Sequence, residues 1–203
     1  MPIKLNSASG GSVTLDVPAT ASTYTHTFPA ETGTVLTSSS NVSASKLTTG
    51  TVPTARLPAG CIIQVQRGLL TTHTTTTSSS FVDTGMTVDI TPSSTTSKIY
   101  IIMSTGTVSQ ATYGTVLFNL VRNGTTIAQP TSSGTMLSSI NIFTNTIGAQ
   151  GVFRAYLDSP ATTSTCTYKV QWKVDGGTGY LNRHQSNTDY NTFSELVVME
   201  VAQ

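Results

Sequence analysis

Histidine is the side chain that most often acts as a general base near neutral pH, and the chain has three of them in unrelated contexts. A serine hydrolase holds its nucleophile within hydrogen-bond reach of such a base, in many folds on a Gly-x-Ser-x-Gly turn. No such turn accompanies His26, His73 or His184. Because any serine-rich chain offers serines near a histidine, these residues predict no hydrolase, and we expect no enzymatic activity.

Carboxylates offer a second route to catalysis, because cleavage of a polysaccharide needs two of them about 5–9 Å apart across a sugar groove. Glu200 alternates with the apolar residues of a strand, which favours a solvated or paired charge. The acidic residues that we considered are scattered: Asp83, Asp89, Asp158, Asp175, Asp189, Glu195 and Glu200. A polysaccharide-cleaving protein is therefore the least favoured of the functions that we weigh.

A metal site is conceivable only if several copies of the chain meet. A threefold axis would turn one histidine per chain into a three-histidine site, and His26, within Thr25-His26-Thr27, is the candidate. The alternative is an exposed histidine on a strand, which we favour. We therefore expect no metal and no cofactor.

The segment from Gly179 to Asn191 has the composition of a binding surface. Aromatic rings stack on sugar faces, while amide, carboxylate and guanidinium groups satisfy hydroxyls, so the mixture suits a glycan or a protein surface. The alternative is an ordinary polar loop between the last two strands. The candidate binding residues are Tyr180, Asn182, Arg183, His184, Asp189 and Tyr190.

Residues 47–58 combine proline and β-branched residues without helical periodicity, and they carry too few apolar side chains to bury a core alone. Proline lacks an N–H group and suits extended chains whose sheet ladders are interrupted. A flexible linker is the alternative, but linkers seldom carry regularly placed valine and leucine. We expect intertwining with other copies of the chain through Leu47, Val52, Pro53, Leu57 and Pro58.

The composition excludes one class of partner and favours assembly. Charged residues make up 9% of the 203 residues, the net charge is +1, and there is no cluster of Lys and Arg. Nucleic-acid binding depends on such a cluster, so we expect no nucleic-acid partner. Low charge also weakens the repulsion that keeps free proteins apart, which favours life inside an assembly.

The two cysteines, Cys61 and Cys166, lack metal-ligand spacing and predict free thiols in a protein made in a reducing cytoplasm. Cys166 begins an alternating run, so we expect it to be half-buried. No apolar run approaches the roughly 18 residues of a membrane span, and we expect none.

Short runs with period-two alternation predict an all-β protein. Residues 167–174 alternate without a fault, with Tyr168, Val170, Trp172 and Val174 inward. Residues 98–103 are apolar on both faces, as in a strand covered on each side, and residues 196–201 are expected to form a final central strand. Asn123-Gly124 is a hairpin signal. About eight strands at this spacing predict an antiparallel sandwich of jelly-roll type.

The change in apolar density predicts two regions, an N-terminal anchoring and shaft region over residues 1–60 and a β-sandwich head over residues 61–203. Three stretches resemble bacteriophage tail-fibre and related virion appendage proteins. Residues 13–21 together with residues 28–37 resemble an N-terminal element of such fibres, and residues 47–57 resemble their LTTGTVPTARL shaft element. Residues 89–99 and 157–164 are similar to a head domain of phage proteins.

The resemblance implies a homotrimer with an intertwined shaft and a β-sandwich head, located on the virion. Its partners would be its own copies, other virion proteins at the N-terminal region, and a glycan or protein of the host surface. The leading function is host attachment as a tail fibre or fibre tip, and the alternative is a capsid decoration or head-fibre protein. The family's last loop is often longer than residues 190–194 here.

Overall fold

A computed structural model describes residues 3–6, 8–10, 12–15, 52, 56–131, 138–144 and 149–203. The chain divides into two units, residues 1–50 and residues 51–203. Our sequence-based boundary near residue 60 stays a prediction.

Several of the residues that we expected to act in assembly fall outside this description. Leu47, Pro53 and the metal candidate His26 lie outside the described residues. Val52 is 51% exposed, Pro58 is exposed and Leu57 is half-buried. Their packing against an axis therefore stays a prediction.

In the first unit the described residues form a two-stranded antiparallel hairpin of β1 (Ile3–Asn6) and β2 (Ser12–Leu15). Ile3 pairs with Leu15 and Asn6 with Ser12. Gly10, in the connection, has a φ of 85°, a left-handed value that costs glycine little. The predicted alternation from Val13 to Leu15 does lie on a strand.

The second unit is all-β, and every strand pairing among its described residues is antiparallel. Its strands are β3 (Ile62–Leu70), β4 (Thr74–Thr76), β5 (Val82–Ile90), β6 (Lys98–Ser104), β7 (Val108–Gln110), β8 (Gly114–Arg122), β9 (Thr125–Ile127), β10 (Ile140–Thr144), β11 (Phe153–Asp158), β12 (Cys166–Val174), β13 (Gly179–Leu181) and β14 (Ser194–Val201).

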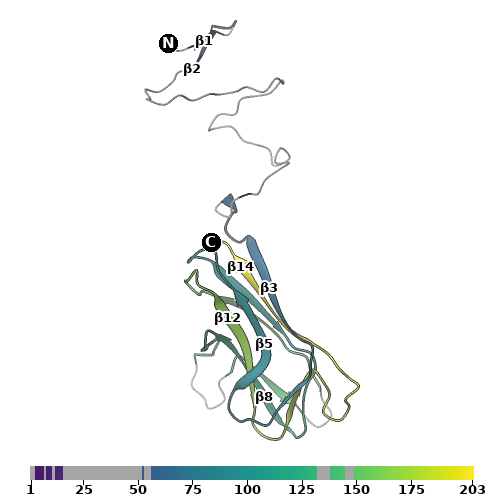
Figure 1. The fold of residues 1–203 in the computed structure, drawn as a ribbon. Coiled ribbons are helices and arrows are strands. Elements are labelled where there is room, and N and C mark those ends of the chain that lie inside the picture. The colour runs from purple at the N-terminus through teal and green to yellow at the C-terminus, as the bar shows by residue number, and fades with distance from the viewer. Residues whose placement is uncertain are drawn as a thin grey trace. The chain divides into compact units, whose positions relative to one another are not determined.

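The strands form three sheets, and two of them enclose the core. The five-stranded sheet has the order β10-β8-β12-β5, with β9 also paired to β8, and the four-stranded sheet has the order β11-β6-β14-β3. Figure 1 shows β3 and β14 running side by side, as their register requires. One continuous apolar cluster receives side chains from both sheets, so the unit is a β-sandwich.

Period-two alternation decides which side chains enter this core. On β12, Tyr168, Val170, Trp172 and Val174 are buried as predicted, and Cys166 is fully buried rather than half-buried. Both cysteines are free thiols. The strand β14 is central in its sheet, as expected, and buries Leu196 and Val198.

The expectation for residues 98–103 is met on one face only. Ile99, Ile101 and Met103 of β6 are buried in the core, while Tyr100 on the other face is 37% exposed. The strand that is buried on both faces is instead β8, whose residues 115–121 are all buried. The outer face of β6 therefore has no complete cover within the described part of the chain.

Two buried carboxylates join strands across the sandwich. Asp158 of β11 accepts hydrogen bonds from the Arg122 guanidinium at 2.6 Å and from the Tyr168 hydroxyl at 2.7 Å. Burial, and then the hydrogen bond to Asp158, raise the pKa of Tyr168, so this phenol remains a donor at any ordinary pH. Asp158 is the last residue of β11.

Glu200 of β14 is the second carboxylate and is fully buried. It accepts hydrogen bonds from the Gln64 amide at 2.6 Å and from the backbone N–H and hydroxyl of Ser93, each at 2.7 Å. Burial by itself raises the pKa of Glu200, but these donors, with Ser97, outweigh burial and lower it. The charge is therefore paired rather than solvated.

The third sheet, of order β4-β13-β7, positions the candidate site. Gly179 of β13 pairs with Thr76 on one side and Gln110 on the other, and Leu181 pairs with Thr74 and Val108. The segment that follows β13 leads directly to the first residue of β14. Loops from β3, β6 and β12 are thereby gathered at the end of the sandwich where β14 begins.

Candidate functional site

The predicted binding segment begins on β13 and continues through the loop that leads to β14. Within β13, Gly179 and Leu181 are buried, and Tyr180 between them points to the other side. A Cβ at position 179 would lie 2.7 Å from the Val174 side chain, so a larger residue here would force Val174 to move. The close packing of β13 fixes where Tyr180 and the following loop lie.

Asn182 holds the loop and does not face solvent. It is fully buried, and its φ of 67° is a left-handed value that asparagine adopts more readily than most residues. Its amide donates to the carbonyls of Leu70 (2.9 Å) and Thr72 (3.0 Å), and its carbonyl accepts from the Ser194 hydroxyl at 2.5 Å. Asn182 therefore joins three segments, and we place it in the scaffold rather than among the residues that meet a ligand.

Tyr180 and Arg183 lie together beside this anchor. The Arg183 guanidinium carbon lies 4.6 Å from the centre of the Tyr180 ring, a cation–π contact. Both side chains are half-buried. Arg183 also forms an isolated antiparallel bridge with Asn191, so the outgoing and returning parts of the loop are paired here. The stacked pair thus borders the loop that carries the remaining candidates.

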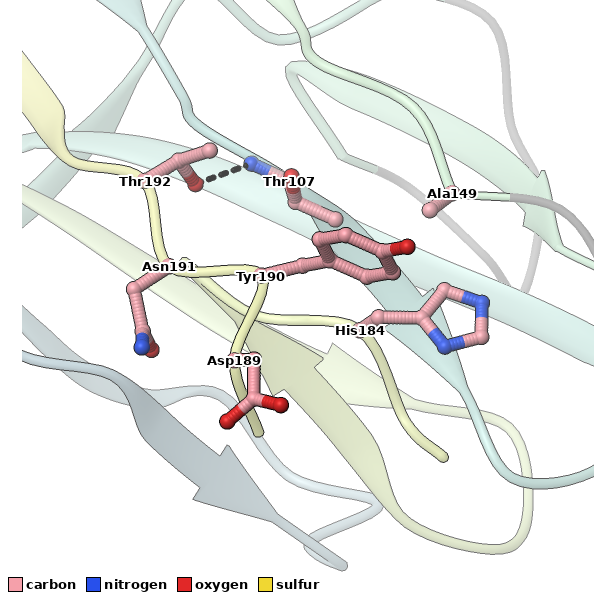
Figure 2. A pocket seen from close by; sticks show the side chains of 7 residues that line it. All are labelled: Thr107, Ala149, His184, Asp189, Tyr190, Asn191 and Thr192. Atoms are coloured by element: carbon pink, nitrogen blue, oxygen red, sulfur yellow. Dashed lines mark hydrogen bonds between the residues drawn. The ribbon is translucent and has the colours of Figure 1, made fainter. Parts of the chain in front are cut away.

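Three candidates come together in an open groove of about 420 Å³. His184, Asp189 and Tyr190 line it, and its other lining residues are Thr107, Ala149, Asn191 and Thr192. Figure 2 shows the Tyr190 ring extending from the loop towards His184 and Ala149, with Thr107 beside it. Tyr190 is 66% exposed, so its ring is available to a partner.

The His184 ring is oriented by its neighbour Ser186. The backbone N–H of Ser186 donates to Nδ1 of His184 at 3.2 Å, and the Ser186 hydroxyl lies 2.9 Å from the same atom. With Nδ1 as the acceptor, the neutral ring carries its proton on Nε2. His184 therefore presents an N–H donor from the part of the ring that Ser186 does not contact.

Local hydrogen bonds also fix the loop that carries Tyr190. The Asn187 side chain accepts from the N–H of Asp189 at 2.8 Å, and the Asn191 amide donates to the Thr188 carbonyl at 2.8 Å. The Thr107 N–H donates to the Thr192 hydroxyl at 2.8 Å, as Figure 2 marks. These bonds hold Tyr190 between two ordered positions, which lowers the entropy that a ligand must remove on binding.

The chemistry of the groove is that of polar recognition. It combines an exposed phenol ring, an imidazole N–H, an exposed carboxylate and threonine side chains, which can stack on a ring and satisfy hydroxyl or amide groups. The arrangement therefore suits binding of a polar surface group.

Sequence reasoning missed the other walls of the groove. Thr107 lies just before β7 and Ala149 just before the Gln150–Val108 bridge, so both come from segments far from residues 179–192. Gly106 permits the approach, since a Cβ there would collide with the side chain of Thr192. In the sequence, Gly106 is an isolated glycine in a polar connection, which indicates a close approach of another segment. It does not indicate that the approaching segment is the one that contains Thr192.

Most of the acidic residues hold the fold. Asp83 pairs with Lys169 at 3.0 Å, Glu195 lies 3.8 Å from Arg67, and Asp175 accepts from the Thr115 N–H at 2.7 Å. Asp158 and Glu200 are buried in the networks described above. Asp89 and Asp189 are exposed. Of these acids, Asp189 alone lines the groove.

No family model matches this chain, and a search of curated proteins gives no match either. Within the described ranges, no helix is long and apolar enough to span a membrane. The same residues contain no group of three His, Cys, Asp or Glu side chains placed to hold a metal ion.

Proposed function

We propose that this chain is a virion structural protein, a homotrimeric phage tail fibre or fibre tip that attaches to a glycan or protein of the host surface. In this proposal residues 1–60 anchor the protein to other virion components and form the shaft. The head presents the groove of His184, Asp189 and Tyr190, bordered by Tyr180 and Arg183. Three identical sites on one particle would raise the effective concentration of weak individual contacts.

The position of the groove is the observation that carries the proposal. The groove lies just before the first residue of β14, whereas the last residues of the chain pair with the segment that enters the head. Gly60 donates to the Ala202 carbonyl at 2.8 Å, and Ala202 donates to the Cys61 carbonyl at 2.9 Å. The eight residues of β14 separate the two places by about 25 Å. The groove is therefore at the end of the head opposite to the point where the chain enters it, as a site that meets a host surface would require.

The strand order supports a jelly-roll assignment for the head. The main strands pair first with last and so on inwards: β3 with β14, β5 with β12, β6 with β11 and β8 with β10. A long hairpin that wraps around a core gives this nested order, and jelly rolls are common in viral and lectin domains. The order fits the proposed virion role.

Competition for adsorption tests the proposal. The full chain, added in excess, should block adsorption of the parent phage, and Tyr190→Ala should weaken this competition by at least tenfold through loss of the ring contact. Tyr113→Ala is the matched control, since Tyr113 is 79% exposed but does not line the groove. Equal competition by both variants would contradict the groove assignment. Immunogold labelling of capsids rather than tails would favour the decoration alternative.

A further inference from the structure

The four-stranded sheet has an outer face that is apolar across all four strands. The register places Leu157 beside Tyr100, Tyr100 beside Met199 and Met199 beside Val65, so these four side chains form one row. We call the set of outward apolar residues on this sheet the apolar outer face. Its members are Ile62, Val65, Leu69, Tyr100, Ile102, Phe153, Ala155, Leu157, Val197, Met199 and Val201.

The largest of these side chains are exposed in the single chain. Phe153 is 67% exposed, Leu157 51% and Val65 53%, and Ile62, Leu69 and Tyr100 range from 37% to 56%. A fully covered aromatic side chain removes about 150–250 Å² from water, so these six present on the order of 500 Å² of apolar surface. That is close to the largest patch on a typical monomer, about 300–600 Å².

The size of the face fits an interface between copies of a chain. A stable interface covers about 800 Å² on each partner, and about 65% of a homodimer interface is apolar. The apolar outer face would supply that apolar share. The polar share of the interface would come from other outward residues of the same strands, namely Arg67, Lys98 and Ser104.

The charges on the face do not oppose self-association. Arg67 of β3 lies diagonally across from Glu195 of β14, with 3.8 Å between the charged groups, and Lys98 donates to the Ser159 hydroxyl at 2.7 Å. These are the charged residues at outward positions of the four strands, and none of them forms a cluster of one sign. A second copy could therefore cover the apolar residues without juxtaposing like charges.

The connection to the N-terminal region places this face near other copies. Backbone bonds hold Gly60 and Cys61 to the end of β14, next to Ile62 at the start of β3. Five residues of chain span at most about 17 Å, so Ile62 would lie within that distance of Leu57. If Leu57 packs at a trimer axis, as proposed above, β3 leaves the axis with Ile62 and Val65 close to the neighbouring chains.

We infer that neighbouring copies of this chain pack their heads together through the apolar outer face. The inference rests on the proposed homotrimer and adds to it the surface that joins the heads. It also accounts for the apolar residues on both faces of β6 and β14, a pattern typical of strands that are covered on each side. The second cover is another head.

Thiol labelling of the full chain tests the inference. In a Cys61→Ser background, Val65→Cys and Leu157→Cys place one thiol on the face, and Val82→Cys, at the start of β5 in the other sheet, is the matched control. Cys166 is fully buried and adds only a slow background. In the single chain Val82 is the least exposed of the three positions, at 38%, so an isolated subunit would label the control no faster than the others. The assembled protein should reverse this order.

We expect labelling by a bulky maleimide to be at least tenfold slower at positions 65 and 157 than at position 82, with sedimentation showing three copies. Three copies with fast labelling at positions 65 and 157 would overturn the inference but leave the proposed trimer in place. A single copy in sedimentation would overturn both. Two face positions are used so that one disturbed variant does not decide the result.

Discussion

The outer faces of the two main sheets are built from similar strands but differ in what they present. On the five-stranded sheet the outward residues of β12 include Lys169, Gln171 and Lys173, and Asp83 of β5 bonds to the first two. Lys173 lies 4.9 Å from the Phe81 ring centre. We call the outward side of β12 and β5 the polar outer face; the outward residues of β8 in the same sheet are buried. The four-stranded sheet instead presents the apolar outer face.

The difference between the two outer faces can be seen in the residue patterns of their central strands. On β12, polar and apolar residues alternate, so one face of the strand is buried in the core and the other faces water. On β14, Leu196 and Val198 fill the core while Val197 and Met199 point the other way. The central strands β12 and β14 thus differ in pattern: β12 is apolar on its core face alone, whereas β14 is apolar on both faces. We attribute the second apolar face of β14 to the proposed contact with another head.

Placing charge on the apolar outer face should have the largest effect. Val65→Arg combined with Leu157→Arg would bury unpaired guanidinium groups, each at a cost of about 3–5 kcal/mol, so association should weaken by at least about a hundredfold. Sedimentation across a concentration series measures this change. Thr87→Arg, at an exposed position of β5 that pairs with Lys169, should leave association within about threefold, since single surface changes are usually within about 0.5 kcal/mol. Equal weakening by both would remove the distinction between the sheets.

A smaller effect is expected from the buried carboxylate behind the apolar outer face. Glu200→Gln replaces an acceptor of charge-assisted hydrogen bonds, so the free energy of unfolding at neutral pH should fall by about 1.5–3 kcal/mol. The folded-state pKa of Glu200 is below its unfolded value, so its contribution is complete above about pH 4.3 and is lost as the pH falls through the folded-state value.

Chemical denaturation from neutral to acidic pH measures this behaviour. The difference between wild type and Glu200→Gln should stay constant at neutral pH and shrink in acid. A difference that is unchanged in acid would show that the loss comes from packing rather than from the charge of Glu200.

The smallest effect is expected on the polar outer face. The Gln171 amide and then the Lys169 ammonium lower the pKa of Asp83, but the Asp83 and Lys169 side chains are 48% and 42% exposed. Asp83→Asn should therefore cost less than about 1 kcal/mol, and the cost should shrink as salt screens the pair. Unfolding free energies at low and high salt measure this. A loss as large as that of Glu200→Gln would mean that this exposed pair contributes as much to stability as the buried carboxylate.

Much of the sandwich could be predicted because alternation and turn chemistry are local. The residues of β12 that were expected inward are buried, and Asn123-Gly124 does connect β8 to β9, with φ values of 48° and 84° that suit a tight hairpin. Period-two patterns fix the face of each side chain whatever the partner strand is. All-β architecture follows directly from them.

Short polar strands could not be predicted in the same way. Thr74–Thr76 forms β4 within a run that reads as a polar loop, and Val108–Gln110 forms β7. Their backbones pair with β13 through hydrogen bonds that do not depend on side-chain type. The composition of a segment carries little information about such pairing.

The candidate site was predictable only where it is continuous in sequence. His184, Asp189 and Tyr190 line the groove, but Thr107 and Ala149 reach it through strand pairing across the fold. Asn182 has the side chain of a ligand contact and instead satisfies the backbone carbonyls of Leu70 and Thr72. Residue type alone does not separate these two uses of an amide.

The pairing of β3 with β14 determines how the head would bear a pull. In the proposed fibre, a ligand held in the groove would pull on the start of β14, while the virion would pull on Gly60 beside the end of β14, so the force would run along the strand. The register from Ser194–Leu70 to Val201–Ile62 then loads its hydrogen bonds in shear, all at once, rather than peeling them one by one. A tethered head of this build would resist mechanical unfolding far better along this axis than across it.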